Sequence, residues 1–333
     1  MADKVRVGFI GAGNLANSIH YPCLASLPDV ELVANCDLLE DKAKETAERF
    51  SIPRTFTDYE EMLAEVDPQV VYVIMPPQDL FAPAAAVLQQ GRHLFVEKPL
   101  GMTTKQAQML AYFAEEHSCL TAVGFQRRHI PALTALKKRV EESGPIHQAT
   151  VSFLKGGPNR PHDQPSGVYG GVIDALTVDG IHAVDNLRFL CGGEVEEVSA
   201  RVRTRYMPGP YPNEYTALVS FSSGAVGILS FSYVSCIGVF RAEINGKGAS
   251  AYVDAATQSY IRSGDGVHEV YDSKEFATTE GISGDDTSVN WMGFWHEDRH
   301  FIDCVKAGRQ PLTHFADAAK TMELVDHIYR LGS

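Results

Sequence analysis

Residues 5–16 read VRVGFIGAGNLA, and this stretch decides the fold. Its apolar first half predicts a buried strand, and the glycines after it predict a turn that enters a helix. Gly11 permits the tight turn, Gly13 lets the backbone approach a pyrophosphate, and Ala16 replaces a third glycine where helix and strand pack closely. The helix N-terminus offers free N–H groups and a positive dipole end to phosphates. The stretch therefore predicts a dinucleotide-binding βαβ unit.

Asp37 strengthens this interpretation, because it ends the second predicted strand, ELVANCD at 31–37. A carboxylate at this place accepts hydrogen bonds from the ribose hydroxyls of the dinucleotide. It would repel the 2′-phosphate of NADP, and Leu38 and Leu39 supply no cation to receive one. Lys42 and Lys44 follow at the start of the next helix and weaken this argument. We expect NAD as the cofactor, with NADP disfavoured.

The first part of the chain alternates predicted strands with helices such as 40–50 and 104–116. Continuous apolar strands separated by helices indicate a parallel sheet covered on both faces, with right-handed crossovers. The fold class is α/β, and residues 1–125 are predicted to form an NAD(P)-binding Rossmann domain with a doubly wound parallel sheet. The predicted strands are 5–10, 31–37, 54–56, 70–74, 93–97 and 120–124.

The pattern changes after residues 144–145, where a Gly-Pro pair precedes the strand 146–155. One helix at about 180–190 follows, and then a succession of strands with turn residues between them continues to about 271. Two helices, at about 291–307 and 315–331, end the chain. Residues 126–333 are therefore predicted to form an α+β domain for substrate binding and oligomerisation, with a large, mostly antiparallel sheet that has one open face.

Composition excludes several classes of partner. The 333 residues carry a formal net charge of −13, which repels nucleic-acid phosphates and anionic lipid. No apolar run approaches the length of a membrane span, and the opening residues show no signal-peptide pattern. The six cysteines are scattered in apolar contexts and are interpreted as buried thiols of a cytoplasmic protein. The histidines and cysteines lack ligand spacing, so we expect no metal.

A second motif, Glu97-Lys98-Pro99, ends the predicted strand 93–97. In the usual strand order this strand lies two neighbours from the first, or roughly 10 Å away. Ligands of open α/β sheets bind outside the carboxyl ends of the strands, so Lys98 would lie where a nicotinamide ring binds. The alternative is a solvated surface lysine.

With these motifs in view, the chain resembles the glucose–fructose oxidoreductase / inositol dehydrogenase (Gfo/Idh/MocA) family of sugar and polyol dehydrogenases. The matching pieces are GFIGAGNLA at 8–16, CD at 36–37, MPP at 75–77, EKPLG at 97–101, GFQRR at 124–128, DGIHAVDNLRFL at 179–190 and the helical ending at 294–330. The resemblance implies that Lys98 lies beside the substrate hydroxyl, that the Lys98–Pro99 bond is cis, and that Arg127 lies near the nicotinamide end. The cofactor contacts it implies are Gly11, Ala12, Gly13, Asn14, Leu15, Asp37, Pro76, Glu97, Lys98 and Arg127.

The resemblance also implies a substrate-facing Asp-x-x-x-His pair, and here the sequence departs from the family. His182 fills the histidine position, but Val178 stands where the aspartate is expected, and the nearest carboxylate is Asp179. Residues three apart share a helix face, so Asp179 could still act with His182, or it could only cap its helix. His182 lies beside the apolar stripe of its helix, which favours a substrate-facing ring over a buried structural one. The predicted catalytic residues are Lys98, His182 and Asp179.

These residues predict hydride transfer between a nicotinamide and a secondary alcohol or carbonyl of a sugar, polyol or cyclic diol. Two alternatives remain open: an NAD-dependent glycoside hydrolase, and a nucleotide-binding sensor that keeps the fold without the chemistry. The loop 156–171, with Arg160 and His162, is expected to border the substrate pocket. Aromatic residues that could face a sugar ring, or belong to the core, are Tyr169, Trp291, Phe294 and Trp295.

The partners expected are a small-molecule substrate and further copies of the chain. The run ALVSFSSGAVGILSFSYVS at 217–235 is too apolar for a freely solvated sheet face, and apolar surface of this kind marks interfaces. We therefore expect a homodimer or homotetramer built through the open face of the sheet.

Overall fold

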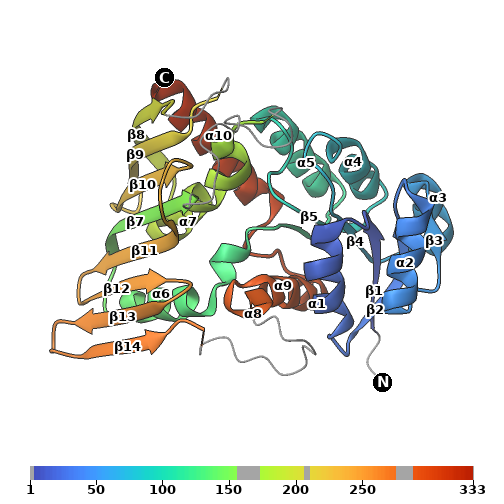
Figure 1. The fold of residues 1–333 in the computed structure, drawn as a ribbon, viewed down its shortest axis with the longest axis horizontal. Helices are drawn as coiled ribbons and strands as arrows, with labels where there is room; N and C mark the ends of the chain where they lie inside the picture. Colours follow the sequence, from blue (N-terminus) through green and yellow to red (C-terminus); the bar gives the residue numbers. More distant parts are fainter. Residues whose placement is uncertain (1–3, 156–172, 206–210, 275–287, 333) are drawn as a thin grey trace. The chain divides into compact units, whose positions relative to one another are not determined.

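The computed structural model describes residues 4–155, 173–205, 211–274 and 288–332, which form two units (Figure 1). Within the described residues, unit 1 comprises 4–126, 288–289 and 294–320, and unit 2 comprises 127–155, 173–205, 211–274, 290–293 and 321–332. Three of the described helical segments have residues in both units: η2 (Gln126–His129), α8 (Ser288–Trp291) and α10 (Phe315–Gly332). Each unit is built around its own sheet.

Unit 1 contains a parallel sheet in the order β3-β2-β1-β4-β5-β6. This is the order of the doubly wound dinucleotide-binding fold, and it confirms the expected fold class, with β5 two strands away from β1. The strands are β1 (Val5–Ile10), β2 (Val30–Cys36), β3 (Thr55–Phe56), β4 (Val70–Val73), β5 (His93–Val96) and β6 (Thr121–Val123).

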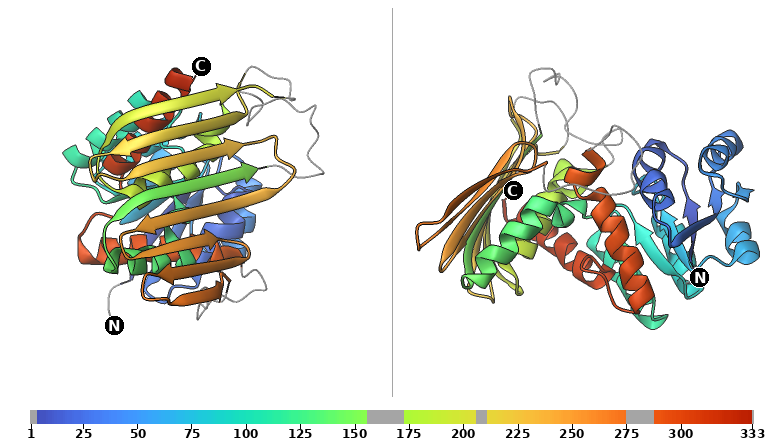
Figure 2. Two further views of the ribbon diagram at one scale, coloured as in Figure 1. Left: turned by 90° about the vertical axis from the view of Figure 1, so that its left-hand side faces the viewer. Right: turned by 90° about the horizontal axis from the view of Figure 1, so that it is seen from below.

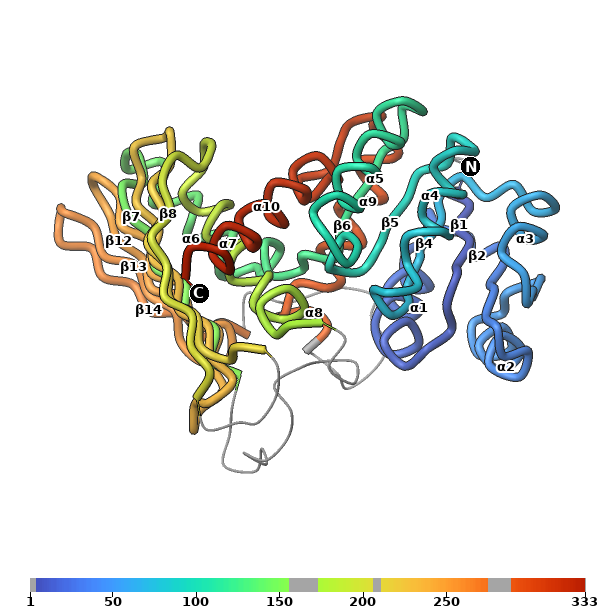
Figure 3. Tube along the Cα trace, turned by 90° about the horizontal axis from the view of Figure 1, so that it is seen from above, coloured from blue at the N-terminus to red at the C-terminus, as the bar shows by residue number. Residues whose placement is uncertain are grey.

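The helices of unit 1 follow the strands along the chain. They are η1 (Ala16–His20), a π-helical turn that continues into α1 (Tyr21–Ala25), then α2 (Glu40–Phe50), α3 (Tyr59–Val66), α4 (Phe81–Gln89), α5 (Thr104–Glu116) and α9 (Phe294–Ala307). Their starts follow local rules: Asp58 caps α3 by accepting bonds from two N–H groups, and Thr103 caps α5. Helices α4 and α5 pack against each other (Figure 3).

The core of unit 1 includes a stack of aromatic rings. The rings of Phe9 and Tyr21 lie 3.9 Å apart between centroids, and those of Tyr72 and Phe95 lie 4.5 Å apart. Phe301 joins this stack from α9, which contacts α1 and η1. The sequence prediction, in which the second domain comprises all of residues 126–333, places helix α9 in the second domain. The helix belongs instead to unit 1. The reason is packing: the apolar face of α9 is buried in the first core.

Unit 2 contains an eight-stranded sheet in the order β14-β13-β12-β11-β7-β10-β9-β8. All neighbours are antiparallel except β10 and β7, so the sheet is mostly antiparallel as expected. The strands are β7 (Ile146–Lys155), β8 (Val195–Arg203), β9 (Glu214–Phe221), β10 (Val226–Ser232), β11 (Gly238–Gly246), β12 (Ala249–Asp254), β13 (Gln258–Ser263) and β14 (His268–Asp272). The remaining helical segments are η2 (Gln126–His129), α6 (Pro131–Glu142), η3 (Leu176–Gly180) and α7 (Ile181–Cys191).

Helices α6 and α7 pack on one face of this sheet, and the other face carries no described helix (Figure 2). Alternation along β9 and β10 sends Val219, Leu229 and Phe231 to the helix side, where all three are fully buried. Leu218 points to the open face and is 49% exposed. Much of the apolar character of the run 217–235 therefore serves the core, and the open face is more polar than the uninterrupted run suggested.

Cysteine burial follows the expectation at five of six positions. All six cysteines are free thiols, and Cys23, Cys36, Cys119, Cys191 and Cys304 are buried. Cys236 is exposed, contrary to the prediction, because it lies in the connection between β10 and β11 rather than within a strand. Among the helices described, we find none with the length and apolarity that a membrane crossing needs.

Candidate functional site

The glycine-rich turn after β1 has the geometry that a dinucleotide requires. Gly11 has φ +112°, and a Cβ added there would lie 2.1 Å from the carbonyl oxygen of Ile74. A Cβ at Gly13 would meet no atom within 4 Å, so its backbone faces open space. Ala16 is fully buried at the start of η1, as expected where helix and strand pack closely. The residues present thus fit a pyrophosphate, with Asn14 and Leu15 exposed at the helix N-terminus.

Asp37 is tied to this turn. Its Oδ2 accepts a hydrogen bond from the backbone N–H of Ala12 at 2.8 Å, and its Oδ1 accepts one from the N–H of Leu39 at 3.0 Å. Each carboxylate oxygen has a second lone pair, so these bonds leave room for ribose hydroxyls. Leu38 is 89% exposed, and the Lys44 ammonium pairs with Glu40 within α2 at 2.7 Å. The carboxylate therefore has a fixed orientation at the end of β2.

Asn17 is a residue of this site that the sequence reasoning missed. Its side-chain amide donates to the carbonyl oxygens of Ala12 at 2.9 Å and Gly13 at 3.3 Å, and it is bonded to Thr46 of α2. These bonds hold the turn against the first helix. Its only sequence signal is an amide one residue after the fingerprint, where a helix interior usually disfavours asparagine.

The Glu97-Lys98-Pro99 motif lies at the carboxyl end of β5, as predicted, and the Lys98–Pro99 bond is cis. Lys98 is half-buried. Glu97 is buried, and its Oε2 accepts from the backbone N–H of Lys98 at 3.1 Å. Pro76, which follows β4 at the same edge of the sheet, is exposed, and its carbonyl accepts from the N–H of Asp79. Within unit 1, the predicted cofactor residues thus gather at one edge of the parallel sheet.

A buried histidine, His20, lies next to Glu97, and the sequence analysis does not predict it. His20 ends η1 with no exposed surface, and its Nε2 lies 3.2 Å from Oε1 of Glu97. Its Nδ1 lies 3.1 Å from Oδ1 of Asp298, which is also fully buried. Burial opposes the charged imidazole, but attraction and hydrogen bonds from Asp298 and then Glu97 outweigh it and raise the pKa of His20 to about 10.

In unit 2, Asp179 does not cap its helix. The N-cap position of η3 is Ala175, and the carboxylate of Asp174 just before it accepts from the N–H and hydroxyl of Thr177. Asp179 lies within the π-helical turn η3, and its Oδ2 accepts from Nζ of Lys155 at 2.5 Å and from the hydroxyl of Tyr233. The two donors come from β7 and from the end of β10. Asp179 is thus part of a polar cluster on the sheet, which no residue spacing in the sequence predicts.

His182 is 5% exposed, although its place beside the apolar stripe predicted a less buried ring. The reason is that α7 packs on β7 and β10 and is buried on nearly every face, with only Phe189 half-buried. The imidazole packs edge-on to the ring of Phe153 at 6.5 Å between centroids. Val178, in the position where the family's aspartate is expected, is a buried core residue.

Arg127 begins the described part of unit 2 and is buried. Its guanidinium carbon lies 4.4 Å from the ring centroid of Phe153 and 4.2 Å from that of Phe240. Burial lowers the pKa of Arg127 to about 10, against an opposing attraction to Asp179. Two aromatic faces thus hold this cation in place.

Next to it, Arg128 forms a two-pronged ion pair with Asp185 of α7, with N–O distances of 2.7 and 2.5 Å. Both side chains are buried, and Thr321 of α10 donates to the same carboxylate at 3.1 Å. Such pairs fix the relative position of segments far apart in the chain. Here the pair anchors η2 to α7, the helix that carries His182.

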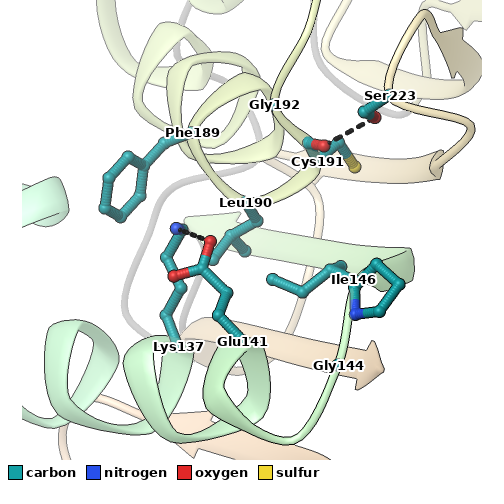
Figure 4. Close-up of a pocket in the computed structure, with 10 residues that line it drawn as sticks. Lys137, Glu141, Gly144, Ile146, Phe189, Leu190, Cys191, Gly192 and Ser223 are labelled. Atoms are coloured by element: carbon teal, nitrogen blue, oxygen red, sulfur yellow. Dashed lines mark hydrogen bonds and ion pairs between the residues drawn. The ribbon is translucent and has the colours of Figure 1, made fainter. Parts of the chain in front are cut away.

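A cavity of about 260 Å³ in unit 2 lies at the other end of α7 (Figure 4). Its lining includes the ion pair of Lys137 and Glu141, at 2.5 Å, and the ring of Phe189 under the Lys137 ammonium. Phe189 lies seven positions after His182, which is about 10 Å along a helix. No predicted catalytic residue lines this cavity, so we do not assign the substrate to it.

Several predicted pocket residues fall outside this site or outside the described residues. The loop 156–171, with Arg160, His162 and Tyr169, lies outside the described residues. The Trp295 indole donates to Ser26 and packs on the core of unit 1, and the Trp291 ring lies 5.4 Å from the Lys274 ammonium. Across the part of the chain that the structure describes, no cluster of three or more metal-ligating side chains is present.

Comparison with known proteins agrees with this architecture. A family model described as "Oxidoreductase family, NAD-binding Rossmann fold" matches residues 5–125, and the "GFO/IDH/MocA C-terminal domain" matches residues 134–252. The chain is 26% identical over 337 residues to "scyllo-inositol 2-dehydrogenase (NAD(+))" of Bacillus subtilis (strain 168), covering 97% of this chain and 93% of the relative. It is 24% identical over 335 residues to "Trans-1,2-dihydrobenzene-1,2-diol dehydrogenase" of Sus scrofa, covering 97% and 96%.

Among solved structures, GenD2 from gentamicin A biosynthesis in complex with NAD superimposes with a TM-score of 0.79 at 27% sequence identity, covering 100% of this chain and 95% of that chain. The two family models together span most of the chain, from the glycine-rich turn to β12. The geometry of that turn, with Asp37 beside it, agrees with the NAD-binding description of the first model. The chain therefore belongs to the GFO/IDH/MocA family of NAD-binding oxidoreductases.

Proposed function

We propose that this protein transfers a hydride between NAD and a secondary alcohol, or the corresponding carbonyl, of a sugar, polyol or cyclic diol. The observation that carries the proposal is the shared edge of the unit 1 sheet. There the open backbone of Gly13, the carboxylate of Asp37 and the motif of Lys98 follow β1, β2 and β5. The activities for which the relatives are named, those of an inositol dehydrogenase and a dihydrobenzenediol dehydrogenase, support the substrate class.

The cofactor would be held by the residues from Gly11 to Leu15, by Asp37, and by Pro76 at the neighbouring strand end. When bound, NAD supplies the nicotinamide that accepts or returns the hydride. The chain contributes orientation: Gly11 and Gly13 admit the phosphates, and Asp37 takes ribose hydroxyls. We include Arg127 among the cofactor residues by the family resemblance, with its charge held between two aromatic rings.

Lys98 would stabilise charge on the substrate oxygen. An ammonium beside the reacting hydroxyl favours alkoxide character during oxidation and polarises the carbonyl during reduction. Half-burial excludes part of the water around Lys98, which strengthens this interaction relative to a solvated lysine.

His182 would accept or return the hydroxyl proton, a role that typically contributes about 10²–10⁴-fold to the rate. Asp179 would act less directly. Its carboxylate is held by Lys155 and Tyr233, so it serves to fix polar groups near His182 rather than to carry the proton itself. We assign the proton to Lys98 and His182 as a pair, because an amine and an imidazole can both carry a proton to or from a hydroxyl group.

Steady-state kinetics of variants tests these roles. Lys98→Ala and His182→Ala should each lower kcat by about 10²-fold or more, and Asp179→Asn should lower it less. NADH affinity, titrated separately, should be kept in all three. Lys105→Ala, an exposed lysine of α5, is the matched control and should behave as wild type. Near-normal turnover in Lys98→Ala would overturn the role assigned to Lys98, whereas a wild type that binds NADH but turns over no substrate would favour a nucleotide-binding sensor.

A substrate panel tests the reaction class. The absorbance of reduced nicotinamide should change with NAD and at least one member of a set of inositols, sugars and cyclic diols. Glycoside cleavage without net change in that absorbance, with NAD bound throughout, would point instead to an NAD-dependent hydrolase.

We further propose that copies of the chain associate through the open face of the unit 2 sheet, in the cytoplasm. Leu218, half exposed on β9, one strand in from the β8 edge of this face, opposes Ile228 across β9 and β10. Leu218→Glu should shift the light-scattering mass at micromolar concentration toward the monomer. Met109→Glu, which charges a similarly exposed apolar residue of α5, should leave it unchanged. A light-scattering mass of a single chain for the wild type would contradict this proposal.

A further inference from the structure

His20 lies between two segments that the proposed hydride transfer uses, and the following inference rests on that proposed function. The residue ends the helical turn that begins after the dinucleotide loop. Its neighbour Tyr21 donates a hydrogen bond from its hydroxyl to the carbonyl of Gly11 at 3.3 Å. The His20 ring itself reaches the end of β5, where its Nε2 lies 3.2 Å from Oε1 of Glu97.

A proton on both nitrogens of the ring satisfies its surroundings. Nδ1 faces the carboxylate of Asp298, at 3.1 and 3.2 Å from its two oxygens, while Nε2 faces Glu97. A neutral imidazole has one N–H group, so it could donate to only one ionised carboxylate. All three side chains are buried, and a buried ionised carboxylate is costly unless a partner of opposite charge pairs with it. An imidazolium has two N–H groups, so it can donate one hydrogen bond to each carboxylate.

Glu97 in turn has little freedom to move. Its Oε2 accepts from the N–H of Lys98 at 3.1 Å. A Cβ placed on Gly124 would lie 2.8 Å from the Glu97 carboxyl carbon, so only the bare backbone of a glycine leaves room for this carboxylate. The Glu97 side chain is therefore enclosed by His20, by Gly124 and by its own strand end.

We propose that His20 is a positioning residue for the reaction: by holding the Glu97 carboxylate, it sets the backbone of Lys98 and thereby the place of the Lys98 ammonium at the substrate. His20 does not touch the reacting atoms. The ring packs against Phe95 of β5 at 5.1 Å between centroids, which keeps it beside the same strand. Because small misplacements of a reacting group cost about 10²-fold in rate, turnover should depend on this buried ring.

Two amide substitutions separate positioning from simple core filling. The side-chain nitrogen of Gln reaches the place of Nε2, so His20→Gln keeps a donor toward Glu97 and loses the one toward Asp298. Asn reaches only the place of Nδ1, so His20→Asn keeps the donor toward Asp298 and loses the one toward Glu97. We expect kcat of His20→Asn to fall about 10²-fold, and kcat of His20→Gln to stay within about 10-fold of wild type. Equal kcat values in two variants of similar Tm would overturn the proposal.

A double-mutant cycle tests the route through Glu97. Glu97→Gln alone should lower kcat about as much as His20→Asn, and adding His20→Asn to it should cause little further loss. Fully additive losses would overturn the proposal. If His20→Asn does not fold, Glu97→Gln still provides the test, because wild-type turnover in that variant refutes the role of the carboxylate.

Lys98→Ala distinguishes the failure of this inference from the failure of the proposed function. Inactive Lys98→Ala with fully active His20→Asn overturns the positioning role alone. Active Lys98→Ala overturns the role of Lys98 and, with it, the positioning role of His20, while a wild type that turns over no member of the substrate panel overturns the proposed function itself. The dissociation constant of NADH should stay within about threefold of wild type in His20→Gln and His20→Asn, since both variants keep the glycine-rich turn and Asp37, to which we assign the phosphates and the ribose.

Discussion

Replacing Asp37 by asparagine removes one negative charge from the end of β2 and keeps the shape of the side chain. In the folded protein the two carboxylate oxygens accept from the N–H groups of Ala12 and Leu39. The asparagine oxygen can keep the bond to Ala12, at the turn that faces the phosphates. The substitution therefore tests the charge of Asp37 with the turn retained, whereas Asp37→Ala would remove both acceptors.

The size of the effect follows from the charge that NADP adds at the ribose 2′ position. At a separation of about 4 Å, each unit of phosphate charge is repelled by about 1 kcal/mol in water and about 4 kcal/mol at an effective dielectric constant of 20. Asp37 is half-buried, so its surroundings lie between these limits. The wild type should thus prefer NADH over NADPH by about 5- to 10³-fold. Leu38 and Leu39 provide no cation that would offset the repulsion of the 2′-phosphate by Asp37.

Fluorescence titration of both reduced cofactors measures the ratio of dissociation constants. In Asp37→Asn the preference for NADH should shrink at least about fivefold, mainly through tighter NADPH binding, and added salt should narrow the wild-type ratio. Glu48→Gln, which neutralises an exposed carboxylate of α2, is the control and should leave the ratio unchanged. Tighter NADPH than NADH binding by the wild type, or an unchanged ratio in Asp37→Asn, would refute the reasoning.

Gly11→Ala should abolish NADH binding, because the new Cβ would lie 2.1 Å from the Ile74 carbonyl oxygen; a folded variant that binds NADH would contradict this. Arg128→Met should lower the free energy of unfolding in urea by about 3–5 kcal/mol, since it leaves the buried Asp185 carboxylate without its guanidinium. Adding Asp185→Leu should recover most of that loss in the free energy of unfolding. Strictly additive losses in the double variant would contradict a coupled pair of Arg128 and Asp185. The raised pKa of His20, about 10, stabilises the fold fully below the unfolded value of about 6.5 and less as pH rises toward 10. The Tm of the wild type should therefore fall over that range, and more steeply than that of His20→Gln; parallel curves would exclude the buried imidazolium.

The parts of this protein that could be predicted from its sequence depend on local patterns. Strand and helix alternation in unit 1 is set by residues close together in the chain, and the bounds of α2 and α5 agree with the sequence prediction to the residue. The glycine-rich turn is equally local, because backbone conformation and free space decide which residues it admits. The position of Lys98 at a strand end can also be predicted from the sequence, because the alternation of strands and helices allows only a few sheet topologies.

The apolar run at 217–235 shows where a local pattern misleads. Its period of two was visible, but the sequence does not say which face of the sheet a helix will cover. In the folded unit, α7 covers the face that carries Val219 and Leu229, while Leu218 stays on the open side. The same limit applied to His182, whose burial depends on packing around the whole of α7.

By itself, the sequence determined the dinucleotide turn, the acidic residue at the end of β2, the lysine motif at the end of β5 and the change to an antiparallel sheet. Only the tertiary structure decided that the ring of His20 lies between Glu97 and Asp298, the latter 278 residues away in the chain. It likewise decided that Asp179 binds Lys155 and Tyr233. The physical reason is that hydrogen bonds and charges act over a few ångströms of space, whatever the distance along the chain, and no residue spacing records them.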